Sequence, residues 1–430
     1  MKPIFMLVHV VVASVAVLPV TRAQADTRAL AEVVPPAADA VMTESTVARI
    51  SLAEAVRLAW QRTLASRAAS GQRQQAEAEK DAAYVPWADA PSLEVTHWSD
   101  RWQTDAGQQE SEVGLAWPLL MPGQGAARRA HARAGLVQAE AAERLALLQL
   151  SREVQESAWA LMALHTELAQ SESNLATLSA LADDVERRVR AGDLARADAL
   201  VARSEVLTAS IQHADVRQRL SAARAGWALL TGQEALPDSE LAFSGPGMVT
   251  DAELANHPGL QLANADRERA RARAAQARHE RRSSPELTLG MRRESPGNAQ
   301  PDHESLAIGV RLPLAMNARG RSLQIAAQTE LELAELGYER LREKLRADAE
   351  SARLAVLATT EQFHAAQSRA ALLRERAQLI NQSFRAGERP LPELLRALAA
   401  ATDAESSLGR QQAALGLARA RLHHALGKTP

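Results

Sequence analysis

Two segments of the chain place charged side chains at matching distances from a glycine. Each segment holds Arg-Ala-Gly and has an acid six residues after the glycine, so that Asp198 follows Gly192 and Glu393 follows Gly387. The pattern raises the question of why one chain makes the same glycine break twice, and the elements around each glycine decide what the acids face.

Other residue types give little sign of catalysis or metal binding. The eleven histidines include one adjacent pair, His423-His424, and adjacent residues of a helix point to different sides. The chain has no cysteine, which excludes disulfides, thiol nucleophiles and thiolate metal sites. The Gly-x-Gly at Gly123 and Gly125 lacks the lysine of a phosphate loop, so we interpret it as a joint between a strand and a helix. These observations predict a protein that is not an enzyme and that holds no metal or cofactor.

The N-terminus carries the pattern of an export signal. Lys2 precedes an apolar run over residues 4–20, and a small-x-small site follows at residues 23–25. We therefore expect a signal peptide over residues 1–25. A membrane anchor is the alternative, although the run is short for a membrane span. The formal charge of -2 argues against a nucleic-acid partner, because phosphate binding needs a basic face.

The spacing of 195 residues between the two glycine motifs extends along the chain. Other pairs that share it are Gly114 with Gly309, Pro118 with Pro313, and Gly232 with Gly427. We interpret this as an internal duplication with repeats at residues 51–245 and 246–430. Ser51 and Thr250 begin a predicted capping box at the start of each repeat. Residues 26–50 are expected to form an extended lead segment.

Each repeat contains one predicted β-hairpin. Apolar residues alternate with small or polar ones over residues 109–119 and 303–313, which indicates strands with one apolar and one polar face. Partner strands are expected at residues 91–102 and 285–294, because similar residues precede each alternating run. The chain would therefore contribute four long strands.

Long helices are predicted after both hairpins. No proline occurs over residues 123–235 or 314–389, and the 68 residues from 123 to 190 would form a helix about 100 Å long. Apolar residues in both repeats follow a heptad, which predicts coiled-coil packing. Glycine readily takes the left-handed conformation that ends a helix. Turns are therefore expected over residues 189–198 and 384–393, each followed by a returning helix.

Four strands cannot close a barrel, because closure around side chains takes about eight. A membrane does not tolerate open sheet edges, so several copies must contribute strands. Three copies would supply twelve, an even number as bacterial outer-membrane barrels usually have. Tryptophans beside the first hairpin would lie at the lipid–water interface, with ordinary core positions as the alternative; they are Trp87, Trp98, Trp102 and Trp117.

The sequence resembles the outer-membrane factors of bacterial efflux and secretion systems, the TolC-type channels, and is most similar to the heavy-metal cation efflux (CzcC-like) branch. The resemblance covers essentially the whole mature chain. It rests on the Ser-Leu-Ala-Glu-Ala opening at Ser51, the duplicated order of helix and hairpin, and the paired Arg-Ala-Gly turns. It implies a mainly α fold with a small β part, in which a homotrimer forms a 12-strand outer-membrane β-barrel continued by a periplasmic α-helical coiled-coil tunnel.

The resemblance also implies partners and site residues. The partners are a periplasmic adaptor, an inner-membrane pump of the RND type and the lipid of a Gram-negative outer membrane. Residues of the adaptor-docking tips would be Arg190, Ala191, Gly192, Asp193, Leu194, Arg385, Ala386, Gly387 and Glu388. Residues of the periplasmic constriction would be Asp198, Glu393, Phe384 and Arg389. Plain helix capping and solvated charge are the alternative for each of them.

The chain departs from the family pattern near the second turn. Arg396 stands where some relatives carry a second acid, and Pro390 and Pro392 are unusual there. The implied function is a passive exit duct for heavy-metal cations, while multidrug efflux and type I protein secretion remain open. A periplasmic adaptor or coiled-coil scaffold is the alternative from another class. An adaptor has one helical hairpin nested in β-rich domains, and a scaffold would not need strands with an apolar face at matched positions.

Overall fold

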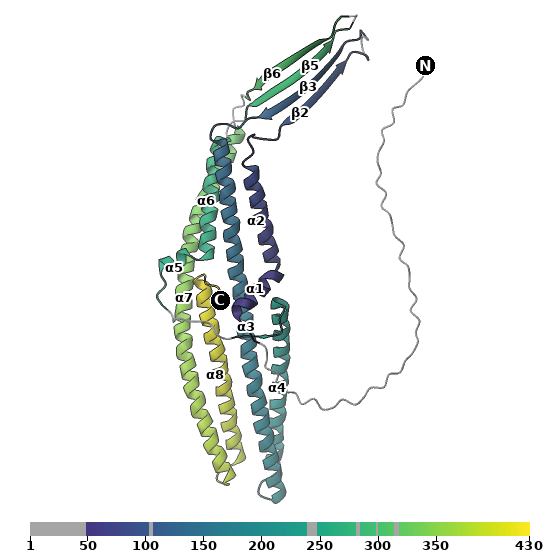
Figure 1. The fold of residues 1–430 in the computed structure, drawn as a ribbon. Helices are drawn as coiled ribbons and strands as arrows, with labels where there is room; N and C mark the ends of the chain where they lie inside the picture. Colours follow the sequence, from purple (N-terminus) through teal and green to yellow (C-terminus); the bar gives the residue numbers. More distant parts are fainter. Residues whose placement is uncertain (1–48, 103–105, 239–246, 281–283, 298–299, 314–317) are drawn as a thin grey trace, which may run out of the picture. The chain divides into compact units, whose positions relative to one another are not determined.

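The structure, a computed structural model, describes residues 49–102, 106–238, 247–280, 284–297, 300–313 and 318–430. The expected signal peptide and most of the expected lead segment lie outside these residues. The described elements belong to one unit, Val47–Pro430. It is mainly helical with a small sheet part (Figure 1), which confirms the prediction of a mainly α fold with a small β part.

The long elements follow one another in the same order twice. The first series is β1 (Arg49–Ile50), α1 (Leu52–Arg62), α2 (Leu64–Ala82), β2 (Ser92–Ser99), β3 (Gln109–Pro118), α3 (Gln124–Ala191), α4 (Arg196–Thr231) and β4 (Leu236–Pro237). The second is α5 (Asp251–Ala255), α6 (Pro258–His279), β5 (Glu286–Ser295), β6 (His303–Arg311), α7 (Ala318–Arg385) and α8 (Leu391–Ala425). Both α3 and α7 have 68 residues.

The two predicted capping boxes form to different extents. Thr250 Oγ1 accepts from the Glu253 N–H and Glu253 Oε2 accepts from the Thr250 N–H, both at 3.3 Å, so this box is complete. Ser51 Oγ accepts from the Glu54 N–H at 3.2 Å. The Glu54 carboxylate, however, accepts from Arg57 Nε at 2.8 Å. An ion pair one turn along the helix thus replaces the second hydrogen bond of the first box.

The four long strands form one antiparallel sheet in the order β2-β3-β5-β6. The two hairpins meet at its centre, where Gly114 of β3 lies opposite Gly290 of β5. A Cβ built on Gly114 meets no atom within 4 Å, and one built on Gly290 would lie 3.5 Å from Glu112 Oε1, an ordinary contact distance. β2 and β6 are the edge strands of this sheet.

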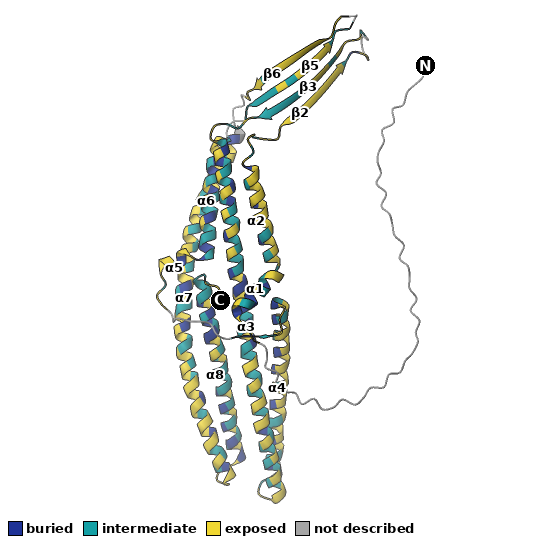
Figure 2. Cartoon of the chain, viewed as in Figure 1, coloured by how far each residue is buried: buried dark blue, intermediate teal, exposed yellow. Residues whose placement is uncertain are grey.

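The two faces of the sheet differ in polarity. Directly opposed residues of antiparallel strands point to the same face, so the register assigns each side chain to a face. The apolar face carries Leu93, Val95, Val113, Leu115, Leu287, Leu289, Met291, Leu306, Ile308 and Val310. The polar face carries Glu94, Thr96, Glu110, Glu112, Arg292, Glu294, Ser305 and Arg311. Eight of these ten apolar residues are nevertheless exposed, with Ile308 at 73%, whereas Leu115 and Leu287 are half-buried; Figure 2 shows the edge strands β2 and β6 as mostly exposed.

The helix α3 lies at the centre of the helical part. Its first half packs against α2 and α6, and its second half packs against α4 and α8. The helix α7 packs against α6 and then against α8. The largest buried cluster joins α1, α3 and α4 around Trp227, whose Nε1 donates to the Ala235 carbonyl at 2.9 Å. Many other buried positions are alanines, which allow the helices to approach closely.

Two histidines, His257 buried and His424 half-buried, join the start of α6 to the end of α8. His257 precedes α6, and its Nδ1 accepts from the Gly259 N–H at 3.0 Å. Burial lowers the pKa of His257 and of His424, and the nearby Arg152 lowers that of His424 further. Both imidazoles are therefore neutral in the native protein near pH 7.

Acidification is expected to destabilise this joint. The unfolded chain takes up these protons near pH 6.5, whereas the native chain takes them up only at lower pH. The free energy of unfolding should therefore decrease as the pH falls below about 6.5. The decrease is at most about 1.4 kcal/mol per pH unit for each histidine. The melting temperature should fall between pH 7.5 and pH 5.5, and His424→Leu should reduce that dependence. If the melting temperatures of the wild type and of His424→Leu depend equally on pH, His424 is not one of the groups responsible.

None of the helices that the structure describes combines the length and the hydrophobicity of a membrane span.

Candidate functional site

The first predicted glycine turn ends α3 in a Schellman motif. Gly192 has a φ of 89°, and its N–H donates to the Val189 carbonyl at 3.1 Å. The Asp193 N–H donates to the Arg188 carbonyl at 2.9 Å. These two bonds satisfy carbonyls that the helix end would leave without partners, and the left-handed conformation between them favours glycine.

The second turn repeats this geometry at the end of α7. Gly387 has a φ of 80°, and its N–H donates to the Phe384 carbonyl at 3.0 Å. The Glu388 N–H donates to the Ser383 carbonyl at 2.9 Å. No atom lies within 4 Å of a Cβ built on either turn glycine. The backbone conformation, and not crowding inside the chain, is therefore what requires glycine at both turns.

The two acids lie at equivalent positions in the first turns of α4 and α8 but bind different groups. Asp198 Oδ2 accepts from the Ala195 N–H at 3.2 Å. Pro390 occupies the equivalent position before α8 and has no N–H. Glu393 Oε1 instead accepts from Arg389 Nη1 at 2.8 Å. Each carboxylate thus accepts a hydrogen bond from a residue just before its own helix, and it remains partly exposed.

The helices α3 and α4 form one helical hairpin, and α7 and α8 form another. Side chains of both helical hairpins form one apolar cluster next to the turns. Its buried members are Val185, Ala202, Phe384, Leu391 and Leu394. The Arg188 guanidinium carbon of α3 lies 5.0 Å from the centroid of the Phe384 ring, and its Nη1 donates to the Phe384 carbonyl at 3.3 Å. The two hairpin ends are therefore packed together as one structure, which we call the tip.

The residues predicted from the sequence divide into surface and interior positions of the tip. The exposed ones are Arg190, Ala191, Gly192, Asp193, Arg385, Ala386, Gly387, Glu388 and Arg389. Leu194, Asp198 and Glu393 are half-buried. Phe384 is only 2% exposed, so within this chain it is a core residue. Arg396 donates to the Pro392 carbonyl of its own helix at 3.2 Å.

Removing the Phe384 ring should destabilise the tip strongly. We expect Phe384→Ala to lower the free energy of unfolding by about 3–5 kcal/mol, because truncation of a buried aromatic leaves a cavity. Gln382→Ala, at an exposed position of the same helix, should change it by less than about 0.5 kcal/mol. Urea titration of both purified variants measures the difference. A loss below about 1 kcal/mol in Phe384→Ala would show that the cluster does not hold the hairpins together.

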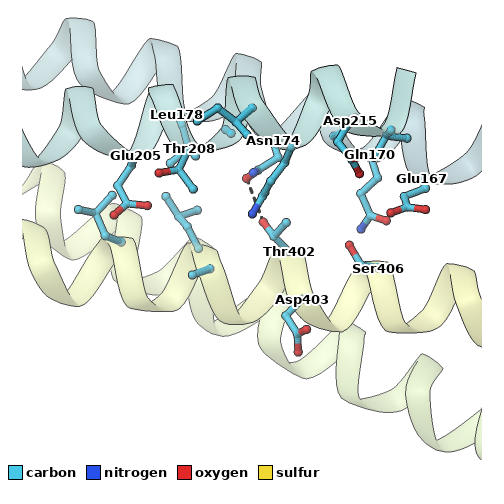
Figure 3. A pocket seen from close by; sticks show the side chains of 18 of the residues that line it. Glu167, Gln170, Asn174, Leu178, Glu205, Thr208, Asp215, Thr402, Asp403 and Ser406 are labelled. Carbon is cyan, nitrogen blue, oxygen red and sulfur yellow. Dashed lines mark hydrogen bonds between the residues drawn. The ribbon is translucent and has the colours of Figure 1, made fainter. Parts of the chain in front are cut away.

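A groove lined mainly by polar residues lies between the two helical hairpins, bounded by α3, α4 and α8 (Figure 3). Its volume is about 660 Å³. Asn174 Oδ1 accepts from Thr402 Oγ1 across it at 3.1 Å, and Arg219 bridges Glu167 at 2.8 Å and Asp215 at 2.9 Å. In the described part of the chain, no group of three or more His, Cys, Asp or Glu residues could hold a metal ion. Another acid of the lining, Asp403, pairs at 3.2 Å with Arg369 of α7.

The four tryptophans of the first hairpin do not share one face. Trp117 lies on the apolar face of the sheet and Trp98 on the polar face. Trp102 follows β2 and is 93% exposed, whereas Trp87 pairs with Leu119 beyond the other end of β3. Indole rings therefore occur near both ends of the sheet.

Sequence reasoning did not identify Arg188, which covers the Phe384 ring. The signal available was a basic residue in the last turn of α3, four residues before Gly192. Comparison of the repeats could not reveal its role, because the residue 195 positions later is Ser383. The contact with Phe384 depends on how the two hairpins pack, which neither repeat specifies alone.

No protein-family model and no curated protein matches the sequence. Solved structures of outer-membrane channels share the fold. One is CusC, whose structures describe folding and transmembrane channel formation. It is 19% identical to this chain with a TM-score of 0.74, and the match covers 88% of this chain and 92% of CusC. The outer membrane protein VceC of Vibrio cholerae is 15% identical with a TM-score of 0.72, over 88% and 96%. The open state of the MtrE outer membrane channel of Neisseria gonorrhoeae is 16% identical with a TM-score of 0.70, over 88% and 89%.

Proposed function

We propose that the chain is the outer-membrane channel of a tripartite efflux system, a passive exit duct that docks a periplasmic adaptor and an inner-membrane pump of the RND type. The observation that carries this proposal is a sheet with an exposed apolar face and two edge strands, joined to two 68-residue helices. Such a sheet buries its apolar face in lipid. The fold shared with outer-membrane channels supports this function over an enzymatic one.

Three copies would close one 12-strand barrel in the outer membrane of a Gram-negative bacterium. A membrane leaves no unpaired strand edge, so β6 of each copy would pair with β2 of the next. Strands of eight to ten residues are close to the length that a tilted membrane strand needs. The apolar face would contact lipid and the polar face would line the duct. Trp98 would then face the duct, and Trp87, Trp102 and Trp117 would remain as interface aromatics.

The adaptor is proposed to dock on the exposed turns of the tip. Gly192 and Gly387 leave open space where other residues would project a side chain, so a partner can approach the backbone there. Arg190, Asp193 and Arg385 supply exposed charge beside this space. Six such turns would surround the duct in a trimer. Of the proposed constriction residues, Phe384 would act by holding the tip together, because it is buried.

The cargo that we propose is heavy-metal cations. The support is the likeness of the sequence to the cation-efflux branch, together with the partly exposed acids Asp198 and Glu393 close to the turns. A trimer would place three copies of each acid at one narrow end of the duct. The resulting negative potential would favour cations. Arg389 and Arg396 would offset part of that potential.

Deletion of the gene tests both the function and the cargo. Growth inhibition would be measured with zinc, cadmium, cobalt, nickel, copper and silver, beside a panel of dyes and antibiotics. We expect a selective loss of metal tolerance that the wild-type gene restores. Sensitivity to dyes or antibiotics alone would contradict the metal cargo and favour multidrug efflux. Unchanged tolerance to every compound would contradict efflux itself.

A further inference from the structure

Positive charge gathers where the long helices leave the sheet. The first ten residues of α3 hold Arg128, Arg129 and Arg133 and no acid. The first ten residues of α7 hold two arginines and no acid. The segment that leads from α2 into β2 adds two aromatic residues, Tyr84 and Trp87. The starts of both long helices are therefore basic, although the whole chain has a formal charge of -2.

The three arginines of α3 contact neutral groups. Arg128 Nη1 donates to the Ala88 carbonyl at 3.4 Å. The Arg129 guanidinium carbon lies 5.7 Å from the centroid of the Tyr84 ring, and Arg133 Nη2 donates to the Tyr84 hydroxyl at 3.2 Å. No carboxylate of the residues that the structure describes forms an ion pair with any of these three guanidinium groups. Their positive charges are therefore available to an anion outside the chain.

These arginines adjoin the end of the apolar face of the sheet. Trp87 pairs with Leu119, which lies two residues after Trp117 and therefore shares its face of the sheet. Arg128 Nη1 also donates to the Trp87 carbonyl at 3.5 Å, and Tyr84 is 53% exposed. The apolar face thus ends in aromatic rings, and positive charge follows directly. Aromatic and long basic side chains in this order are typical of a membrane–water interface.

The arginines also lie at the depth of a lipid headgroup layer. Arg128, Arg129 and Arg133 are four, five and nine residues after the first residue of α3, or about 6, 8 and 14 Å along the helix. A headgroup layer is about 5–8 Å thick on each side of a bilayer. Helical side chains lean toward the N-terminus of their helix, which in α3 is the end beside the sheet. Each guanidinium group therefore extends toward the proposed lipid-facing surface.

We infer that Tyr84, Arg128, Arg129 and Arg133, which we call the junction cluster, bind the phosphate group of an anionic phospholipid in the periplasmic leaflet of the outer membrane. The guanidinium group matches the geometry of a phosphate, and Tyr84 holds two of the arginines around one aromatic ring. A lipid fits better than a free phosphate, because the cluster continues an apolar face on which acyl chains would lie. The inference rests on the proposed function only for the membrane leaflet that the cluster faces.

Lipid titration of the purified full chain tests this site. The protein would be kept in an uncharged detergent and titrated with phosphatidylglycerol or with phosphatidylethanolamine, and native mass spectrometry would count the lipids bound. The test variant combines Arg129→Gln with Arg133→Gln, and a second variant combines Arg129→Lys with Arg133→Lys to keep the charge. Arg342→Gln with Arg346→Gln is the matched control. These two arginines have the same spacing, are exposed, and lie about 36 and 42 Å along α7 from its start.

We expect the wild type to bind phosphatidylglycerol more tightly than phosphatidylethanolamine, because the arginines repel the ammonium group of the second lipid. The glutamine variant should bind phosphatidylglycerol about 30-fold more weakly, since each basic residue near an anionic lipid surface contributes about fivefold. The lysine variant should retain most of the binding, and the control should bind as the wild type does.

Equal affinity of the wild type for the two lipids would overturn the site, as would unchanged binding by the glutamine variant or an equal loss in the control. Displacement of phosphatidylglycerol by glycerol 3-phosphate at the same concentration would overturn the lipid and identify a site for a free phosphate. If the lipid preference is absent while deletion of the gene still changes tolerance, the site fails and the proposed function stands. A confirmed preference in a protein whose deletion affects no tolerance would support the site while the proposed function fails.

Discussion

Replacing Gly192 or Gly387 with tryptophan will abolish export and leave trimers assembled. Both glycines are exposed, and a side chain built on either meets no atom of the chain within 4 Å. The indole would therefore project from the tip surface onto which we propose that the adaptor docks. The left-handed backbone would cost about 1–2 kcal/mol for any non-glycine residue, too little to unfold a domain of ordinary stability.

Alanine at the same two positions is the matched control. Gly192→Ala and Gly387→Ala carry the same backbone strain without the bulk, so they should retain most of the wild-type tolerance. The measurement is growth on the compounds to which the deletion strain is sensitive, beside the amount of trimer in the outer membrane. Wild-type tolerance in both tryptophan variants would sink the docking assignment. Equal loss in the alanine variants would attribute the effect to folding of the turns.

Arginine at Ile308 will prevent the protein from accumulating in the outer membrane. Ile308 lies at the middle of β6 on the apolar face and is 73% exposed. If that face contacts lipid, an arginine there costs about 2–4 kcal/mol near the bilayer midplane, and a trimer carries this cost three times. Ala307→Arg is the control, since Ala307 is the neighbouring residue on the polar face, opposite Gly290.

The amount of each variant in purified outer membranes decides the result. The account expects Ile308→Arg to be depleted at least tenfold and Ala307→Arg to remain near the wild-type level. Equal amounts of the two variants would contradict the assignment of faces. Depletion of Ala307→Arg alone would mean that the polar face contacts lipid.

Local patterns predicted the fold class and the order of the long elements, because each depends on residues close together in the sequence. The alternation that ends at Leu312, the proline-free helices and the glycines with positive φ are all of this kind. Pairing of β3 with β5 joins residues about 180 positions apart, such as Val113 and Met291. No local pattern specifies such a pairing, although the common offset of the repeats makes the two hairpins alike.

Individual contacts at the tip could not be predicted in the same way. The sequence presents Asp198 and Glu393 as equivalents, yet proline at position 390 removes the N–H that Asp198 binds in the other repeat. The resemblance led us to expect Phe384 at a periplasmic constriction, but its ring packs into the core of its own chain beside Arg188. Leu200 and Leu207 of α4, like Leu372 and Leu379 of α7, are seven residues apart, as residues of a heptad core would be, yet they are exposed. Only the packing of the helices distinguishes buried from exposed apolar residues of this spacing.

Membrane fractionation tests the central claim most directly. Envelopes from cells that produce the full chain would be separated on a density gradient, extracted with alkaline carbonate, and run on gels with and without boiling. The account predicts that the protein remains in the outer-membrane fraction after extraction and migrates as a trimer that boiling converts to the monomer. Release into the soluble periplasmic fraction would contradict the channel and identify a periplasmic coiled-coil scaffold instead.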